Sequence, residues 1–228
     1  MAKPAPIVAL ARDLLVLPGE PGAHDLWLWE HSERVAQIAQ QLAELPEVAE
    51  MRPNGVALHA AALFHDAGWA VQVRSGHISR WQVLNRPTND IQRELGAAYL
   101  DEHGHRHIPS DVLRLAVEAI RQCNERSTSL IESRVVAEAE NLDEIGLLHT
   151  LRQFRQHQAE GRPLEQLVQG WQRQQQYQFW EARINDTLRF TASKQLARQR
   201  LATVEQFMSG LERVRCIADV RDALQQPD

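Results

Sequence analysis

Apolar residues recur three or four positions apart along most of the chain, which is the spacing of a buried helical face. No stretch sustains the alternation of apolar and polar residues that a half-buried strand would show. The helical spacing is clearest over residues 26–45, where Val35, Ile38, Leu42 and Leu45 fall on one face. The pattern therefore predicts an all-α fold.

The same spacing predicts further helices along the chain. One begins near Pro53 and Asn54 and ends at Asp66, with Gly68 suited to its C-terminal cap. Residues 129–154 keep the helical spacing throughout and are expected to form one long helical segment. Other helices are expected over residues 89–104, from Ser110 onward, over 165–180 and over 193–214. We find no internal repeat and no interdomain linker, so one helical domain is the simplest expectation.

Composition narrows the class of protein. Apolar residues make up 43% of the 228 residues, and no apolar run approaches the roughly 18 residues needed to cross a bilayer. The N-terminal apolar patch is interrupted by Pro4 and Pro6 and does not resemble a secretory signal. Two distant cysteines form no disulfide framework. We therefore expect a cytoplasmic protein with no membrane partner, and the net charge of -5 argues against an extended nucleic-acid surface.

Two histidines fall on predicted apolar faces. His31 lies four residues before Val35, and His65 lies three residues after Ala62, with Asp66 following at the helix end. Two helices would then direct imidazoles toward a shared interior space. A single histidine on an apolar face is more often a hydrogen-bonded core residue than a metal ligand, and that interpretation stays open for each of them.

A third helix adds acidic groups to this interior. Glu140 lies four residues after Val136, with Glu138 and Asp143 on either side. Buried carboxylates are costly unless they are paired, and a divalent cation would remove that cost. Imidazole and carboxylate ligands together suit manganese, iron(II), nickel or zinc, and also magnesium if the histidines are secondary.

The order of His31, then His65 with Asp66, then an acidic residue resembles the HD-domain superfamily, which is named for its histidine-aspartate pair. The segment "HSERV" is similar to the first motif of the family, and "AALFHDAG" is similar to the second. "AEAENLDEIGLLHTLRQF" and "FTASKQLARQRLATVEQFMSGLE" are similar to segments of a small bacterial single-domain subgroup. The resemblance implies an HD-type helical bundle over residues 25–215. Residues 1–24 would then be an extension, packed on the domain or partly ordered, and residues 216–228 a C-terminal tail.

The resemblance also implies a chemistry. Family members hold one or two divalent metals and hydrolyse phosphate esters with water that the metal activates. Carried over to this chain, the metal ligands are His31, His65, Asp66 and Glu140, and Asp66 is also the catalytic group that positions the attacking water. We therefore expect a metal-dependent phosphohydrolase that acts on a small phosphorylated metabolite or nucleotide.

Three positions depart from the family pattern. Glu140 stands where the third motif usually ends in aspartate, and Gln92 and Cys123 stand where the subgroup has histidines. Neither replacement supplies an imidazole, which argues against a two-metal mechanism and leaves a mononuclear or a catalytically impaired site. The alternative function is a non-catalytic HD-fold ligand-binding or regulatory protein.

Other polar residues are weaker candidates. Arg34, beside the first motif, and Lys194, in the last predicted helix, are the expected substrate-binding residues because they could contact a phosphate group. Arg198 is expected on a solvated helix face, and Trp69 in the core. Among the other histidines, a solvated loop is expected to hold His103, His105 and His107, and His149 is expected to be a packing or surface residue.

Assembly is less constrained by the sequence. A homodimer is the expected partner arrangement, since two-fold assemblies are the commonest. A structural protein that assembles through the glutamine-rich stretch within residues 161–180 is a third alternative, but it would leave the inward histidines unexplained.

Overall fold

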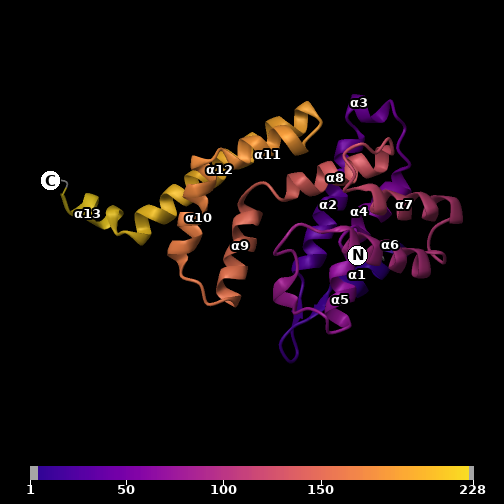
Figure 1. The fold of residues 1–228 in the computed structure, drawn as a ribbon, viewed down its shortest axis with the longest axis horizontal. Helices are drawn as coiled ribbons and strands as arrows, with labels where there is room; N and C mark the ends of the chain where they lie inside the picture. Colours follow the sequence, from indigo (N-terminus) through magenta and orange to yellow (C-terminus); the bar gives the residue numbers. More distant parts are fainter. Residues whose placement is uncertain (1–4, 226–228) are drawn as a thin grey trace. The chain divides into compact units, whose positions relative to one another are not determined.

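The computed structural model describes residues 5–225. Nearly all of the regular structure in this range is helical (Figure 1), so the predicted all-α fold is confirmed. The chain divides into two compact units, Met1–Asp143 and Glu144–Asp228. The domain boundaries expected from the sequence stay a prediction. In the described range, no helix has both the length and the apolar character needed to span a membrane.

The first unit consists of helices and one short hairpin-like pair of strands. The two strands pair antiparallel, with Leu17 opposite Asp25. The elements are α1 (Pro6–Leu15), β1 (Leu17–Pro18), β2 (His24–Asp25), α2 (Trp27–Ala43), α3 (Pro46–Ala49), α4 (Gly55–Phe64), α5 (Ala67–Arg74), the 3-10 helix η1 (Arg80–Gln82), α6 (Asp90–Gly104), α7 (Ser110–Gln122) and α8 (Ile131–Asp143).

Helix α4 forms the interior of the first unit. Seven of its 10 residues are buried, as expected for a helix that is apolar on nearly every side. Helices α2, α7 and α8 contact it, and α5 packs along α6 (Figure 1). Its start is fixed by Asn54, whose side-chain oxygen accepts hydrogen bonds from the backbone N–H groups of Val56 (3.1 Å) and Ala57 (3.0 Å).

Two glycines allow α6 to approach α5 and the end of α4 closely. A Cβ atom on Gly68 would lie 2.1 Å from the carbonyl oxygen of Gln92, and one on Gly96 would lie 2.7 Å from the carbonyl oxygen of Phe64. The expectation that Gly68 caps the preceding helix is therefore wrong. Helix α4 ends earlier, at Phe64, and Gly68 lies inside α5, where glycine is required by the neighbouring backbone and not by a turn.

Replacement of Gly68 by alanine is expected to destabilise the first unit. The new methyl group would meet main-chain atoms that cannot rotate away, so the free energy of unfolding should fall by about 1–3 kcal/mol or more. Urea denaturation followed by circular dichroism measures the change. Gly55→Ala is the matched control, because nothing lies within 4 Å of a Cβ at that position. Equal stability of the two variants would contradict the close approach.

The second unit is a set of helices that follows a short non-helical stretch after α8. Residues 129–154 do not form one continuous segment as expected, because α8 ends at Asp143 and the next helix begins at Leu147. Gly146 between them has a φ of 130°, which side chains rarely tolerate. The elements are α9 (Leu147–Ala159), α10 (Leu164–Gln176), α11 (Phe179–Thr187), α12 (Thr191–Arg215) and α13 (Ala218–Gln225).

A polar cluster lies within the second unit. The carboxylate of Glu144 accepts hydrogen bonds from Arg152 (3.2 Å) and from Arg183. The ring of His149 packs edge-on against Trp180, with 5.0 Å between ring centroids. Burial lowers the pKa of His149 to about 4; Glu144 opposes this shift, whereas the two arginines add to it. His149 is therefore a packed, neutral imidazole, in keeping with the packing role expected for it.

The free energy of unfolding of the second unit is expected to fall as the pH is lowered from about 6.5 to about 4. His149 takes up a proton near pH 6.5 in the unfolded chain but only near pH 4 in the folded one, so the unfolded state binds more protons in this window. The loss should reach up to about 3 kcal/mol at the acidic end. Urea denaturation across this window should show a flatter profile for His149→Phe than for the wild type. The exposed His105→Gln variant is the control, and identical profiles for His149→Phe and wild type would contradict the assignment.

Candidate metal centre

The two predicted metal-binding histidines come together in the first unit. His31 lies on α2 and His65 directly follows α4, and both side chains are buried. Their ring centroids are 5.2 Å apart. The structure therefore places both imidazoles in one interior space, as the helical spacing predicted.

Each imidazole is oriented by a hydrogen bond on the side away from the other. His31 Nδ1 lies 2.7 Å from a carboxylate oxygen of Asp143, and His65 Nδ1 lies 2.7 Å from the carbonyl oxygen of Ala62. A carbonyl or ionised carboxylate oxygen can only accept, so each Nδ1 is the donor. The Nε2 atom of each neutral ring then carries the lone pair, which is the form that binds a metal.

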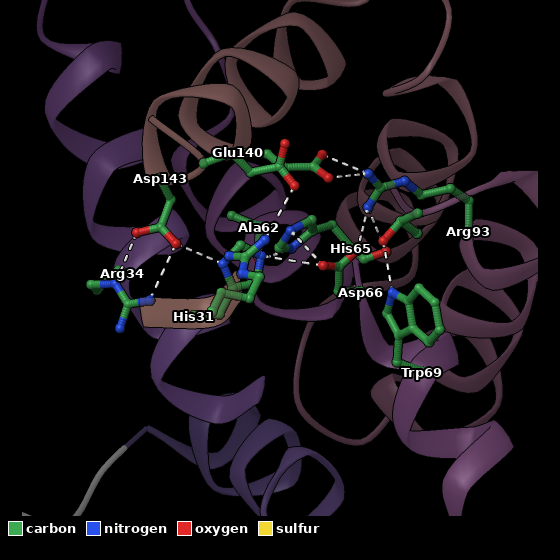
Figure 2. Close-up of polar contacts among 12 residues, drawn as sticks. His31, Arg34, Ala62, His65, Asp66, Trp69, Arg93, Glu140 and Asp143 are labelled. Carbon is green, nitrogen blue, oxygen red and sulfur yellow. Dashed lines mark hydrogen bonds and ion pairs between the residues drawn. The ribbon is translucent and has the colours of Figure 1, made fainter. Parts of the chain in front are cut away.

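Asp66 completes the group. Its Oδ2 atom lies 3.2 Å from His31 Nε2 and 3.6 Å from His65 Nε2 (Figure 2). One ligand atom from each of the three residues lies within 4.8 Å of the others. His65 Nε2 and Asp66 Oδ2 are buried and make no hydrogen bond within residues 5–225. Buried polar atoms are rarely left in this state, and a divalent cation between them would satisfy both.

The electrostatic environment keeps these groups in metal-binding forms. Burial raises the pKa of Asp66, but the neighbouring His65, Arg93 and His31 outweigh it and hold that pKa well below its usual range. Burial is also the main influence on His65, and it lowers the pKa of that imidazole despite the nearby carboxylates of Asp66 and Glu140. The centre therefore offers an ionised carboxylate beside a neutral imidazole.

Asp143 orients His31 from the last turn of α8. Besides its contact with His31, its carboxylate accepts hydrogen bonds from Arg34 Nε (2.8 Å) and Nη2 (3.2 Å). Burial raises the pKa of Asp143, but the hydrogen bonds from His31 and Arg34 dominate, and the pKa lies well below its ordinary value. A carboxylate behind a metal-binding histidine is a common arrangement. The sequence identified Asp143 only as an acidic neighbour of Glu140.

Arg93 on α6 is the member of the centre that the sequence analysis missed. Its guanidinium group donates to Asp66 Oδ1 (2.9 Å) and to the carbonyl oxygen of His65 (2.8 Å). It also donates to both carboxylate oxygens of Glu140, at 2.7 and 2.5 Å (Figure 2). Its position in the helix could have indicated its burial, because Arg93 shares the buried face of α6 with Gly96.

The predicted substrate-binding residues occupy different places. Arg34 lies at the edge of the centre, with 31% of its side chain exposed. Lys194 lies on α12 in the second unit, where its amino group is 3.5 Å from the carbonyl oxygen of Asn185. Their roles toward a substrate stay predictions, as does the role of Glu140 as a metal ligand.

The positions that depart from the family pattern have structural contacts. Gln92 accepts a hydrogen bond from the backbone of Asn89 (3.1 Å) and donates to Gln72 (3.1 Å). Cys123 is buried at the end of α7, and burial raises the pKa of its thiol to about 12. Trp69 is buried as expected, and its indole N–H donates to Thr88 (2.8 Å).

Comparison with known proteins gives a consistent family assignment. The family model described as the HD domain matches residues 28–145. The structure of Bacillus subtilis YpgQ aligns with a TM-score of 0.59 and 20% identity, over 91% of this chain and 92% of that one. YpgQ in complex with ADP aligns at 0.57 and 20% identity, over 91% and 94%.

A third solved structure, a predicted HD superfamily hydrolase from an uncultured Thermotogales bacterium, aligns with a TM-score of 0.54 and 17% identity, over 93% of this chain and 90% of that one. At these identities the likeness concerns the fold alone. No protein with a curated description matches the chain at a significant level. The family model nevertheless spans more than half of the chain and includes both histidines and Asp66. The chain therefore belongs to the HD-domain family.

Proposed function

We propose that this protein is a divalent-metal-dependent phosphohydrolase that acts on a nucleotide or another small phosphorylated compound. The observation that carries the proposal is the convergence of three acceptor atoms, Nε2 of His31, Nε2 of His65 and Oδ2 of Asp66, in a buried space. Both imidazoles are turned so that their donor nitrogens point away from this space. A divalent cation between acceptors arranged in this way would remove the cost of burying them together.

A metal-free alternative exists for the same geometry. A second proton on His31 would let the ring donate to Asp143 on one side and to Asp66 on the other. This would leave Nε2 of His65 buried without a hydrogen bond, whereas a metal ion would satisfy all three atoms. We therefore favour the metal.

The donor set indicates the kind of ion. Two imidazole nitrogens and one carboxylate oxygen suit manganese, iron(II), nickel or zinc, and magnesium less well. Three protein ligands leave coordination positions for water and for a phosphate oxygen. When bound, the ion would lower the pKa of water and neutralise charge on the phosphoryl group.

The surrounding residues would prepare this chemistry. Asp143 and Ala62 fix the two imidazoles, so little reorganisation is needed when the site is loaded. Asp66, held through Oδ1 by Arg93, would present Oδ2 in a fixed direction for the ion and the attacking water. Arg34 reaches solvent at the edge of the centre and would contact the substrate phosphate with the N–H groups that Asp143 does not use.

The substrate class rests on two supports. Phosphate-ester hydrolysis is the typical activity implied by the family resemblance, and the solved structure of YpgQ in complex with ADP shows a nucleotide on a similar fold. Lys194 and a homodimeric assembly belong to the same proposal, as does a location in the cytoplasm. The alternative, a ligand-binding protein without turnover, predicts nucleotide binding by the metal-loaded protein and no hydrolysis across a broad panel of phosphate esters.

Removal of the Asp66 charge is expected to empty the centre. Asp66→Asn should lose bound metal, and phosphatase activity should fall by at least about a hundredfold, because the ion's contribution to charge stabilisation goes with it. Elemental mass spectrometry and release of inorganic phosphate are the two measurements. His105→Gln is the control, since that histidine is exposed on the same unit. Full metal content and full activity in Asp66→Asn would sink the assignment.

Loss of the charge behind His31 should weaken metal binding without abolishing it. Asp143→Asn keeps an acceptor for His31 Nδ1 but removes the ionised group, so the metal dissociation constant should rise by about 10- to 100-fold. Titration calorimetry with manganese(II) measures it. Arg34→Gln removes the other partner of Asp143 and should have a smaller effect. An unchanged dissociation constant in Asp143→Asn would show that Asp143 does not support a metal ligand.

A further inference from the structure

All three nitrogens of the Arg93 guanidinium group donate hydrogen bonds. Together they meet five acceptor atoms on four residues. Nε donates to Asn124 (3.3 Å), Nη1 to the carbonyl oxygen of His65 and to Asp66, and Nη2 to both oxygens of Glu140. The side chain is only 2% exposed. Such an arginine is a fixed part of the interior.

The surroundings hold Arg93 in place. Asn124 is itself fixed by hydrogen bonds to the carbonyl oxygen of Thr88 (3.3 Å) and to Asp90 (3.1 Å). The helix that carries Arg93 lies directly against α5 at Gly68 and Gly96, so its backbone cannot move toward Asp66 or away from it without a clash or a gap. The guanidinium group is therefore a preorganised feature of the fold.

The contacts of Arg93 divide the carboxylate oxygens into two sets. Asp66 Oδ1 and both oxygens of Glu140 accept hydrogen bonds from the guanidinium group. Asp66 Oδ2 does not, and it faces His31 and His65 (Figure 2). Glu140 is thus paired with an internal positive charge that is always present, since arginine does not lose its proton in proteins.

We propose that Arg93 is a built-in cation that withholds Glu140 and one oxygen of Asp66 from metal coordination. The centre then binds one divalent ion, through His31, His65 and the remaining oxygen of Asp66. Arg93 acts as a positioning residue, and it supplies on its side of Asp66 the positive charge that a second ion would bring. The part of the inference that concerns the first ion rests on the proposed function. The part that concerns Arg93 and Glu140 does not.

The test measures manganese(II) binding to the full-length protein, without substrate. Wild type is compared with Glu140→Gln, Arg93→Gln and the double variant that carries both substitutions, by elemental mass spectrometry and titration calorimetry. Circular dichroism checks that each variant is folded. We expect one equivalent of manganese in wild type and in Glu140→Gln, because Glu140 is not a ligand.

Arg93→Gln is expected to behave differently. It releases three carboxylate oxygens in a buried place, so it should take up a second equivalent of manganese, or bind the first at least about tenfold more tightly. The double variant, which lacks both the cation and the Glu140 charge, should lose that gain and return toward wild type. This reversal separates a specific role of Arg93 from a general loosening of the fold.

The outcomes separate the two proposals. Loss of manganese in Glu140→Gln would overturn the inference about Arg93, while metal binding by wild type would leave the proposed function standing. Binding of manganese by Arg93→Gln but not by wild type would support Arg93 as the substitute for a cation, and would remove the basis of the proposed function. Arg93→Gln that binds as wild type does would overturn the inference. If Arg93→Gln does not fold, Glu140→Gln decides, because retention of one equivalent shows that Glu140 is not a ligand, and loss of the ion overturns the inference.

Discussion

Burial of the ionised Asp66 carboxylate is the constraint on which the interior of the first unit depends. A carboxylate removed from water without compensation costs several kcal/mol, so the fold has to surround it with partners. Arg93 takes one oxygen, and the two histidines face the other. The same arrangement occurs again at Asp143, which lies between His31 and Arg34. The buried polar groups are thus connected into one network that joins α2, the junction between α4 and α5, α6 and α8.

The sequence was sufficient for the part of the centre that follows from helical periodicity. His31 and His65 were placed inward because they share a stripe with apolar neighbours, and the structure has both buried and adjacent. The all-α fold follows from the same regularity. Asp66 was located at the end of a helix, and in the structure it stands between α4 and α5. A repeating pattern is a local property, and for this reason it can be read without knowing which helices pack together.

The features that the sequence did not predict are those that depend on a distant partner. The charge on Arg93 suggests an exposed side chain, and its burial makes sense only once Asp66 and Glu140 lie opposite it. The role of Gly68 similarly depends on the backbone of α6. The break between α8 and α9 was missed for another reason, because the apolar spacing continues across it. Helix α8 ends at Asp143, and Gly146, with its φ of 130°, directly precedes α9.

The glycine contact between α5 and α6 has a further consequence. Where two main chains touch, no side chain remains between them to be exchanged, so the spacing of these helices is set by peptide groups alone. That spacing also fixes how far Arg93 stands from Asp66. A side-chain substitution elsewhere in the core leaves this main-chain contact in place, whereas any substitution at Gly68 or Gly96 pushes α6 away and carries Arg93 with it. In evolution or in protein engineering, the two glycines are therefore bound to the chemistry of the centre although neither takes part in it.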